Sequence, residues 1–167
     1  MRAITERELR SCFVNCSRGD AKRLNLPKDF AQSPWEDLDF LGWRDPKAPD
    51  RAYLVAETDD RIAGIALRFA STTGKARGFN STSLCSFCQT VHIGGGVALL
   101  SARRSGEAGK QGNTVGRYLC ADLACSLYVR GRKQTPLGSG QDDGVPLEEK
   151  VVRIRANLDA FVASVVA

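Results

Sequence analysis

The sequence predicts an α+β fold in which helices at both ends of the chain flank a lobe of β-hairpins. Three patterns indicate this class. A capping box, Thr5-Glu6-Arg7-Glu8, begins a helix, because the Thr5 hydroxyl can accept from the Glu8 amide while the Glu8 carboxylate reaches back. β-rich runs follow, and the C-terminal end carries a helical apolar stripe. We therefore expect a small helical segment over residues 1–50 and an α/β lobe over residues 51–167 that ends in a helix.

The N-terminal segment is expected to contain one helix and one aromatic turn. Four side chains continue the apolar face of the helix before Gly19 ends or bends it: Leu9, Cys12, Phe13 and Cys16. Cys12 and Cys16 are four residues apart, a spacing at which both could bind one metal ion. Because they lie on an apolar face, we expect them instead to be small buried side chains. Pro34 suits the first position of a short helical turn that packs Trp35 and its aromatic neighbours on the domain.

Two hairpins are predicted in the middle of the chain. Residues 51–57 and 61–69 are β-rich runs joined by three polar residues, which is a hairpin pattern. Residues 97–104 and 115–119 form a second pair of strands around a Gly-rich loop. The glycines at 94–96 lack the spacing and the Lys-Ser/Thr of a phosphate-binding loop, so they predict a turn.

The last predicted element is an amphipathic helix that begins at Pro146. Apolar residues follow it at alternating spacings of four and three, which keeps them on one helical face: Leu147, Val151, Ile154, Leu158, Phe161 and Val165. We expect this face to pack against the lobe.

Two cysteine pairs dominate the lobe. Cys85 and Cys88 form a CxxC turn, and Cys120 and Cys125 follow after 31 intervening residues, a span long enough for a hairpin. A CxxC turn lets two thiolates face one ion, and a second pair completes a tetrahedral Zn²⁺ site. Four protein ligands leave no position for water or substrate, so the predicted zinc ion is structural. The order of knuckle, hairpin and helix over residues 85–130 predicts a treble-clef zinc finger.

Length and composition exclude several classes. A chain of 167 residues has the size of one large domain or two small lobes, and we expect a monomer. No apolar run approaches the ~18 residues that indicate a transmembrane helix, and the N-terminus lacks the apolar stretch of a signal peptide. Six cysteines without an export signal favour a cytoplasmic protein, in which CxxC pairs indicate metal or redox chemistry.

The charge is unevenly distributed. The net charge is +5, and residues 75–133 hold nine Lys/Arg against two acids, whereas residues 34–60 hold eight acids against three basic residues. A basic cysteine region indicates an acidic partner, either a nucleic acid or an acidic protein surface. An ordinary solvated surface explains the charge equally well.

The cysteine segments resemble those of a known family. Cys85-Ser86-Phe87-Cys88, the run Gly116-Arg117-Tyr118-Leu119-Cys120-Ala121-Asp122, and Cys125 are similar to the treble-clef region of elongation-factor-G-binding proteins of the fusidic-acid-resistance type. The stretch from Trp35 to Trp43 resembles that of short actinobacterial members. The resemblance implies a non-enzymatic zinc protein that binds elongation factor G and frees it from stalled ribosomes, with fusidic-acid tolerance as a consequence.

The resemblance also implies a partner-binding surface. The family's aromatic, basic and tyrosine positions fall on Phe87, Arg117, Tyr118 and Phe161 of this chain. An exposed aromatic held rigidly beside a zinc knuckle loses little entropy on docking, so Phe87 is expected to be a hot spot. The better-known members carry a longer N-terminal helical bundle than the roughly 50 residues that precede the first predicted strand here.

Two other functions compete with this interpretation. The first is an RNA-binding or rRNA-binding zinc module, in which Phe87 would stack on single-stranded bases. The second is an enzyme, but the only histidine, His92, has no metalloenzyme motif around it and is expected to lie neutral on the surface or in a loop. A site closed by four cysteines also leaves a zinc ion no catalytic position.

Overall fold

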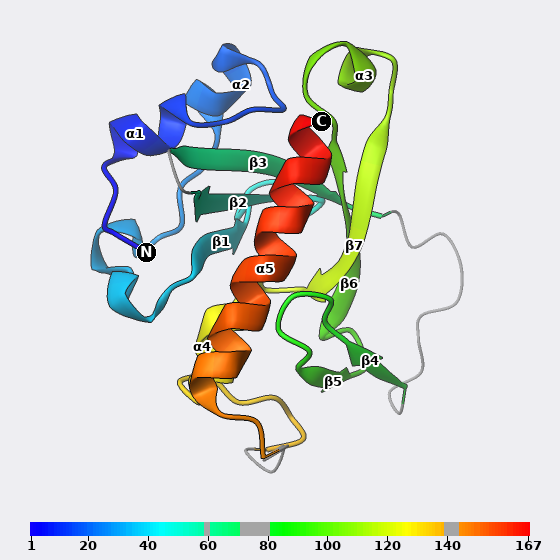
Figure 1. The fold of residues 1–167 in the computed structure, drawn as a ribbon. Helices are drawn as coiled ribbons and strands as arrows, with labels where there is room; N and C mark the ends of the chain where they lie inside the picture. Colours follow the sequence, from blue (N-terminus) through cyan, green and yellow to red (C-terminus); the bar gives the residue numbers. More distant parts are fainter. Residues whose placement is uncertain (59–60, 71–80, 139–143) are drawn as a thin grey trace.

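A five-stranded antiparallel sheet of order β1-β2-β3-β6-β7 forms the centre of the protein (Figure 1). The computed structural model describes residues 1–58, 61–70, 81–138 and 144–167. Its elements, in chain order, are α1 (Glu6–Ser11), α2 (Arg18–Arg23), the 3-10 turns η1 (Phe30–Gln32) and η2 (Trp35–Asp37), β1 (Phe40–Arg44), β2 (Arg51–Glu57), β3 (Ile62–Phe69), β4 (Thr82–Leu84), β5 (Val91–Ile93), β6 (Val97–Arg103), α3 (Gly106–Lys110), β7 (Thr114–Cys120), α4 (Cys125–Val129) and α5 (Leu147–Val166).

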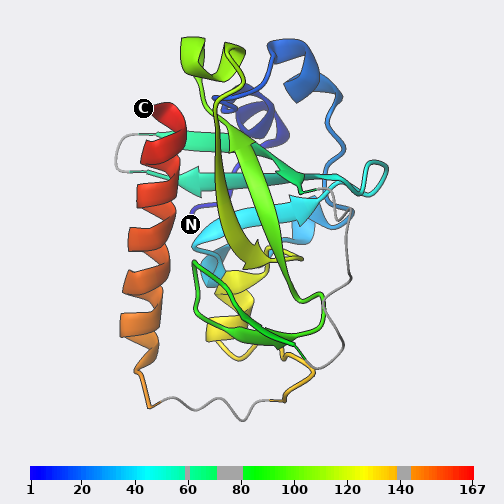
Figure 2. The same ribbon diagram turned by 90° about the vertical axis from the view of Figure 1, so that its right-hand side faces the viewer.

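Helix α5 crosses one face of the sheet, and the N-terminal segment packs against the other (Figures 1 and 2). Side chains alternate along each strand, so the sheet separates two apolar clusters. In β2, Leu54 belongs to the cluster beneath α5, whereas Tyr53 and Val55 belong to the cluster with α1. The mixed helix-and-sheet class predicted from the sequence is therefore confirmed.

Both predicted hairpins are present. Strands β2 and β3 pair from Arg51 with Arg68 to Glu57 with Ile62, and two of the residues that join them, 59 and 60, lie outside the described part of the chain. Strands β6 and β7 pair from Val97 with Cys120 to Arg103 with Thr114. The Gly-rich connection between β6 and β7 contains α3, a short helix that the sequence did not predict.

Strand β1 is the main departure from the predicted organisation. Residues 1–50 were expected to be a helical segment, yet Phe40–Arg44 pair with β2 as the edge strand of the sheet. Phe40 belongs to the cluster beneath α5, and Leu41 and Trp43 to the cluster with α1. The boundary at residue 50 therefore divides one continuous sheet. The predicted turn after Pro34 is present as η2.

The first helix begins as predicted and ends earlier. The Thr5 side chain accepts from the Glu8 amide, and both halves of the capping box are present. The chain leaves the helix after Ser11, because the Val14 amide donates to the Gly64 carbonyl at 2.9 Å and Phe13 forms a β-bridge with Gly64. Gly19 does not end this helix but lies inside α2.

Helix α5 buries most of the predicted stripe. Five of its side chains are buried against the sheet: Ile154, Leu158, Phe161, Val162 and Val165. Leu147, at the start of the stripe, stays exposed. No helix in the described residues is both long and apolar enough to cross a membrane.

Candidate metal centre

The four cysteines singled out by the sequence meet in one buried cluster. Their Sγ atoms all lie within 4.8 Å of one another, and the Cys85–Cys125 and Cys88–Cys120 Sγ atoms are each 3.6 Å apart. These separations are too long for disulfides, in which the sulfurs stand about 2.05 Å apart. Sulfurs at about 2.3 Å from a central Zn²⁺ stand roughly 3.8 Å from one another in a tetrahedron. The cluster therefore fits one structural zinc ion.

Three secondary elements deliver the four sulfurs. Cys85 and Cys88 occupy the turn between β4 and β5, Cys120 ends β7, and Cys125 begins α4. The turn at each cysteine pair contains one residue in the left-handed backbone conformation: Gln89 has φ +58° and Leu123 has φ +56°. The Gln89 amide donates to the Cys85 carbonyl at 2.9 Å, and the Leu123 amide donates to the Cys120 carbonyl at 2.9 Å. The backbone therefore turns tightly at both pairs and aims their sulfurs at a common point.

Mutual hydrogen bonds shift the pKa values of the cluster thiols in opposite directions. Hydrogen bonds from the thiols of Cys120, Cys125 and Cys88 lower the pKa of Cys85, because they stabilise its thiolate. Hydrogen bonds with Cys120 and Cys85 raise the pKa of Cys125, whose proton is held in the cluster. A Zn²⁺ ion replaces these protons and binds four thiolates, and no coordination position is left for substrate.

The other two cysteines do not join the cluster. Burial raises the pKa of Cys12 to about 12, and its Sγ donates to the Leu9 carbonyl at 3.1 Å. Burial also raises the pKa of Cys16. Among the described residues, neither belongs to a group of side chains that could hold a metal. Both remain protonated thiols, but they are half-buried and lie after the end of α1, so the expectation of buried side chains on one helical face is wrong.

His92 is a member of the centre that sequence reasoning missed. Its side chain was expected on the surface or in a loop, but His92 is buried within β5, and its Nε2 lies 3.2 Å from the Cys120 Sγ. A zinc-bound thiolate can only accept a hydrogen bond, so Nε2 must then be the donor. Tyr128 packs edge-on against the imidazole, with ring centroids 4.9 Å apart. Such outer contacts fix the orientation of a ligand sulfur and offset its charge.

Asp122 braces the turn between the second pair of cysteines. Its carboxylate accepts from the Ala124 amide at 3.0 Å and the Tyr128 hydroxyl at 2.8 Å, and pairs with Lys133 at 2.7 Å. Burial alone would raise the pKa of Asp122, but the hydrogen bonds from Lys133, Ala124 and Tyr128 outweigh it and lower the pKa. The carboxylate is therefore ionised and holds the start of α4 in place.

Two of the four predicted partner-binding side chains are buried. Phe87 is 1% exposed and Phe161 is 0% exposed. The Phe87 ring contacts Phe40 and Phe161 edge-on, at centroid distances of 5.8 and 5.6 Å. The expectation that Phe87 presents an exposed ring beside the knuckle is therefore wrong, because the knuckle turns this ring into the core beneath α5. Phe161 lies in the same core.

The other two predicted positions are accessible but face different ways. Tyr118 is 43% exposed, and Arg117 is half-buried, with its guanidinium carbon 6.0 Å from the centroid of the Phe161 ring. Consecutive residues of a strand point to opposite faces, so Arg117 lies on the α5 side and Tyr118 on the other. The structure therefore does not bring the four positions together on one surface.

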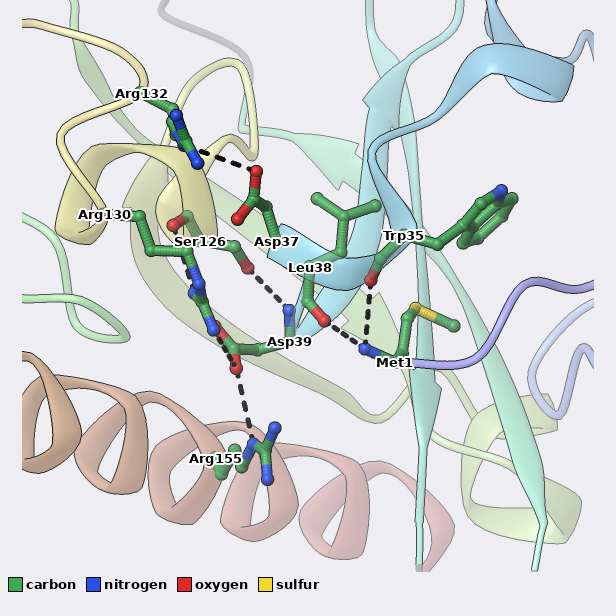
Figure 3. A network of polar contacts seen from close by, with 9 residues as sticks. All are labelled: Met1, Trp35, Asp37, Leu38, Asp39, Ser126, Arg130, Arg132 and Arg155. Atoms are coloured by element: carbon green, nitrogen blue, oxygen red, sulfur yellow. Dashed lines mark hydrogen bonds and ion pairs between the residues drawn. The ribbon is translucent and has the colours of Figure 1, made fainter.

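A buried ion network joins the zinc lobe to the segment before β1 (Figure 3). The Asp39 carboxylate is fully buried. It accepts hydrogen bonds from both Nη atoms of Arg130, at 2.6 and 3.1 Å. Arg155 of α5 approaches the same carboxylate at 3.3 Å, and the Asp39 amide donates to Ser126 Oγ at 2.9 Å. At the rim, Arg132 pairs with Asp37 at 3.4 Å. Part of the uneven charge seen in the sequence is thus neutralised inside the protein.

Comparisons with known proteins agree with this geometry. The model of the family described as "FBP C-terminal treble-clef zinc-finger" matches residues 8–165. Among solved structures, the fusidic acid resistance protein FusC is similar in fold, with a TM-score of 0.50 and 17% sequence identity over 86% of this chain. This chain covers 52% of the FusC chain, about half its length. No curated protein matches by sequence. With its four-sulfur centre and nearly the whole chain matched, the protein belongs to the FBP C-terminal treble-clef zinc-finger family.

Proposed function

We propose that this protein binds translation elongation factor G and promotes its release from stalled ribosomes, with tolerance to fusidic acid as the consequence. The observation that carries the proposal is membership of the treble-clef family together with a fold similar to that of a fusidic acid resistance protein. A zinc ion with four sulfur ligands has no open position for catalysis, which supports a binding role for the zinc lobe. The protein would act in the cytoplasm as a monomer.

Tyr118 is the favoured contact on this chain. Its carbonyl accepts from the Ser86 amide at 2.7 Å, which ties β7 to the knuckle of Cys85 and Cys88. A tyrosine that stands on a rigid strand beside a metal site loses little entropy when a partner covers it. Leu84, 54% exposed, lies two residues before Ser86 and adds apolar area near the knuckle. Sequence reasoning missed Leu84.

Phe87 and Phe161 support the docking face indirectly, as buried core residues. Both rings support the knuckle and α5, so truncating them would alter the fold and not only the docking face. Because Phe87 is buried, its ring cannot stack on RNA bases, as the RNA-binding interpretation of the zinc module required. Factor binding is therefore favoured over recognition of single-stranded RNA by base stacking at the zinc knuckle.

Substituting Tyr118 is the sharpest test of the docking face. We expect Tyr118→Ala to weaken binding of purified elongation factor G about 30-fold, the effect of losing a hot-spot aromatic worth ~2 kcal/mol. Isothermal titration calorimetry measures the affinity. The same variant should lose the ability of the wild-type protein to restore cell-free translation in the presence of fusidic acid.

The control is Val152→Ala, which removes an apolar side chain that is 67% exposed on α5. This variant should bind elongation factor G as the wild type does. If Tyr118→Ala binds normally and Arg117→Ala does not, the docking surface lies on the α5 side of the sheet. If the wild-type protein shows no heat of binding to the factor at all, the proposed function is wrong.

A further inference from the structure

A basic cleft lies on the sheet face that α5 leaves uncovered. Its volume is about 740 Å³. Strands β2, β3 and β6 form its floor, residues 14–25 form one wall, and the end of β6 with α3 forms the other. Both views place α2 and α3 at the same end of the molecule (Figures 1 and 2). Six basic side chains line this space, which we call the arginine cleft: Arg23, Arg51, Arg68, Arg103, Arg104 and Lys110.

The walls of the cleft are held open by specific contacts. The Asn15 amide nitrogen donates to the carbonyls of Ala66 and Arg103, each at 2.9 Å, and its oxygen accepts from the Ala66 amide at 2.8 Å. On the other side, the Ser105 amide donates to the Val165 carbonyl at 2.8 Å. One asparagine therefore fixes the N-terminal wall to two strands of the floor. The cleft exists before any ligand enters.

The positive charge of the cleft is only partly neutralised. Two acids line it, and Asp20 pairs with Arg23 at 2.9 Å. The other, Asp45, is buried and turned inward, where its carboxylate accepts from Asn25 at 2.9 Å and from the Tyr53 hydroxyl at 3.1 Å.

Three arginines of the cleft form no ion pair within the described part of the chain. Outside the cleft, Asp50 pairs with Arg68 at 3.4 Å between exposed groups, and such pairs are weak. Within the described residues, no carboxylate pairs with Arg51, Arg103 or Arg104. Like charges around one concavity repel one another, and an anionic ligand would relieve the repulsion among these three guanidinium groups.

The lining is chemically suited to phosphate oxygens. Guanidinium groups bind phosphate oxygens through paired N–H donors, and the Thr114 hydroxyl lies in the same lining. The only aromatic in the lining, Tyr53, is 6% exposed and cannot act as a stacking platform for bases. We propose that the arginine cleft binds the phosphodiester backbone of RNA without reading its bases.

This site goes beyond the proposed function and is spatially separate from the zinc centre. Arg103 pairs with Thr114 at one end of the β6–β7 hairpin, whereas Cys120 pairs with Val97 at the other. Six residue steps along a strand span about 20 Å. Tyr118 lies four residue steps from Thr114 on β7, so about 14 Å of strand separates the proposed protein contact from the cleft. Such a chain could hold ribosomal RNA while it engages a factor on the ribosome.

The test is direct binding of RNA to the purified zinc-loaded protein in the absence of any factor. Fluorescence anisotropy with a labelled RNA duplex and a labelled single strand measures the affinity over a range of salt concentrations. We expect Arg51→Gln with Arg103→Gln to weaken binding at least about tenfold and to reduce the slope of log affinity against log salt by about 2, one for each lost phosphate contact. A second pair that shares no residue with the first, Arg104→Gln with Lys110→Gln, should act in the same way.

The matched control removes the same charge elsewhere. Arg7→Gln with Lys28→Gln neutralises two exposed basic residues outside the cleft and should leave RNA affinity within about twofold of the wild type. Zinc content and the circular dichroism spectrum report whether each variant is folded. The proposal is overturned if the control loses as much affinity as the cleft variants, if folded cleft variants bind normally, or if polyglutamate displaces RNA as well as unlabelled RNA does. Because no factor is present, failure here leaves the factor-binding proposal untouched.

Discussion

Removal of the metal is expected to unfold the lobe of residues 85–130 and to loosen the core beneath α5. Structural zinc contributes ~10–16 kcal/mol to folding in small finger peptides, whereas a whole domain is stable by only about 5–15 kcal/mol. All four cysteines belong to the larger apolar cluster, and the knuckle places Phe87 against Phe40 and Phe161. Loss of the knuckle therefore removes a central ring from the packing.

Thermal melting followed by circular dichroism measures this effect. A strong chelator should lower the melting temperature and remove the near-ultraviolet signal of the aromatic core, and added Zn²⁺ should restore both. The control is the same chelator already saturated with zinc. An unchanged melting curve after verified removal of the metal would show that the fold does not depend on the ion.

Replacing Asp39 by alanine is expected to destabilise the protein by ~3–5 kcal/mol, the cost of leaving the partner of a buried ion pair uncompensated. The Asp39 side chain is 0% exposed and the Arg130 side chain is 13% exposed, so water cannot replace the lost carboxylate. The substitution would also release Arg155 of α5. Urea unfolding measures the change.

An exposed ion pair of the same types provides the comparison. Asp50 and Arg68 pair at 3.4 Å with side chains that are 60% and 66% exposed. Asp50→Ala should therefore cost less than about 1 kcal/mol. Equal, small effects of the two substitutions would mean that the Asp39 network contributes little and that another contact holds the zinc lobe on the sheet.

Elements with a local signature could be predicted from the sequence. The capping box at Thr5, the two hairpins and the stripe of α5 each depend on residues a few positions apart, and all are present. Strand β1 lacks such a signature, because both of its faces are buried and its residues do not alternate between apolar and polar. The short helix α3 is hidden in a Gly-rich run for which propensity predicts a loop.

The candidate site likewise contains features with a local sequence signature and features without one. The cysteine spacing identified all four sulfurs of the cluster, because few other chemistries need that pattern. The contacts of His92 with Cys120 and of Asp39 with Arg130 join residues 28 and 91 positions apart, and no local pattern marks them. The direction of the Phe87 ring depends on the packing of α5, which its place in the knuckle does not determine.

Zinc K-edge X-ray absorption, combined with elemental analysis, tests the central claim most directly. The claim is that one zinc ion held by Cys85, Cys88, Cys120 and Cys125 organises the lobe that carries Tyr118. We predict one zinc per chain, with four sulfur neighbours at about 2.3 Å and no nitrogen from His92 in the coordination shell. A chain without zinc, or a zinc ion with fewer than four sulfur neighbours, would contradict it.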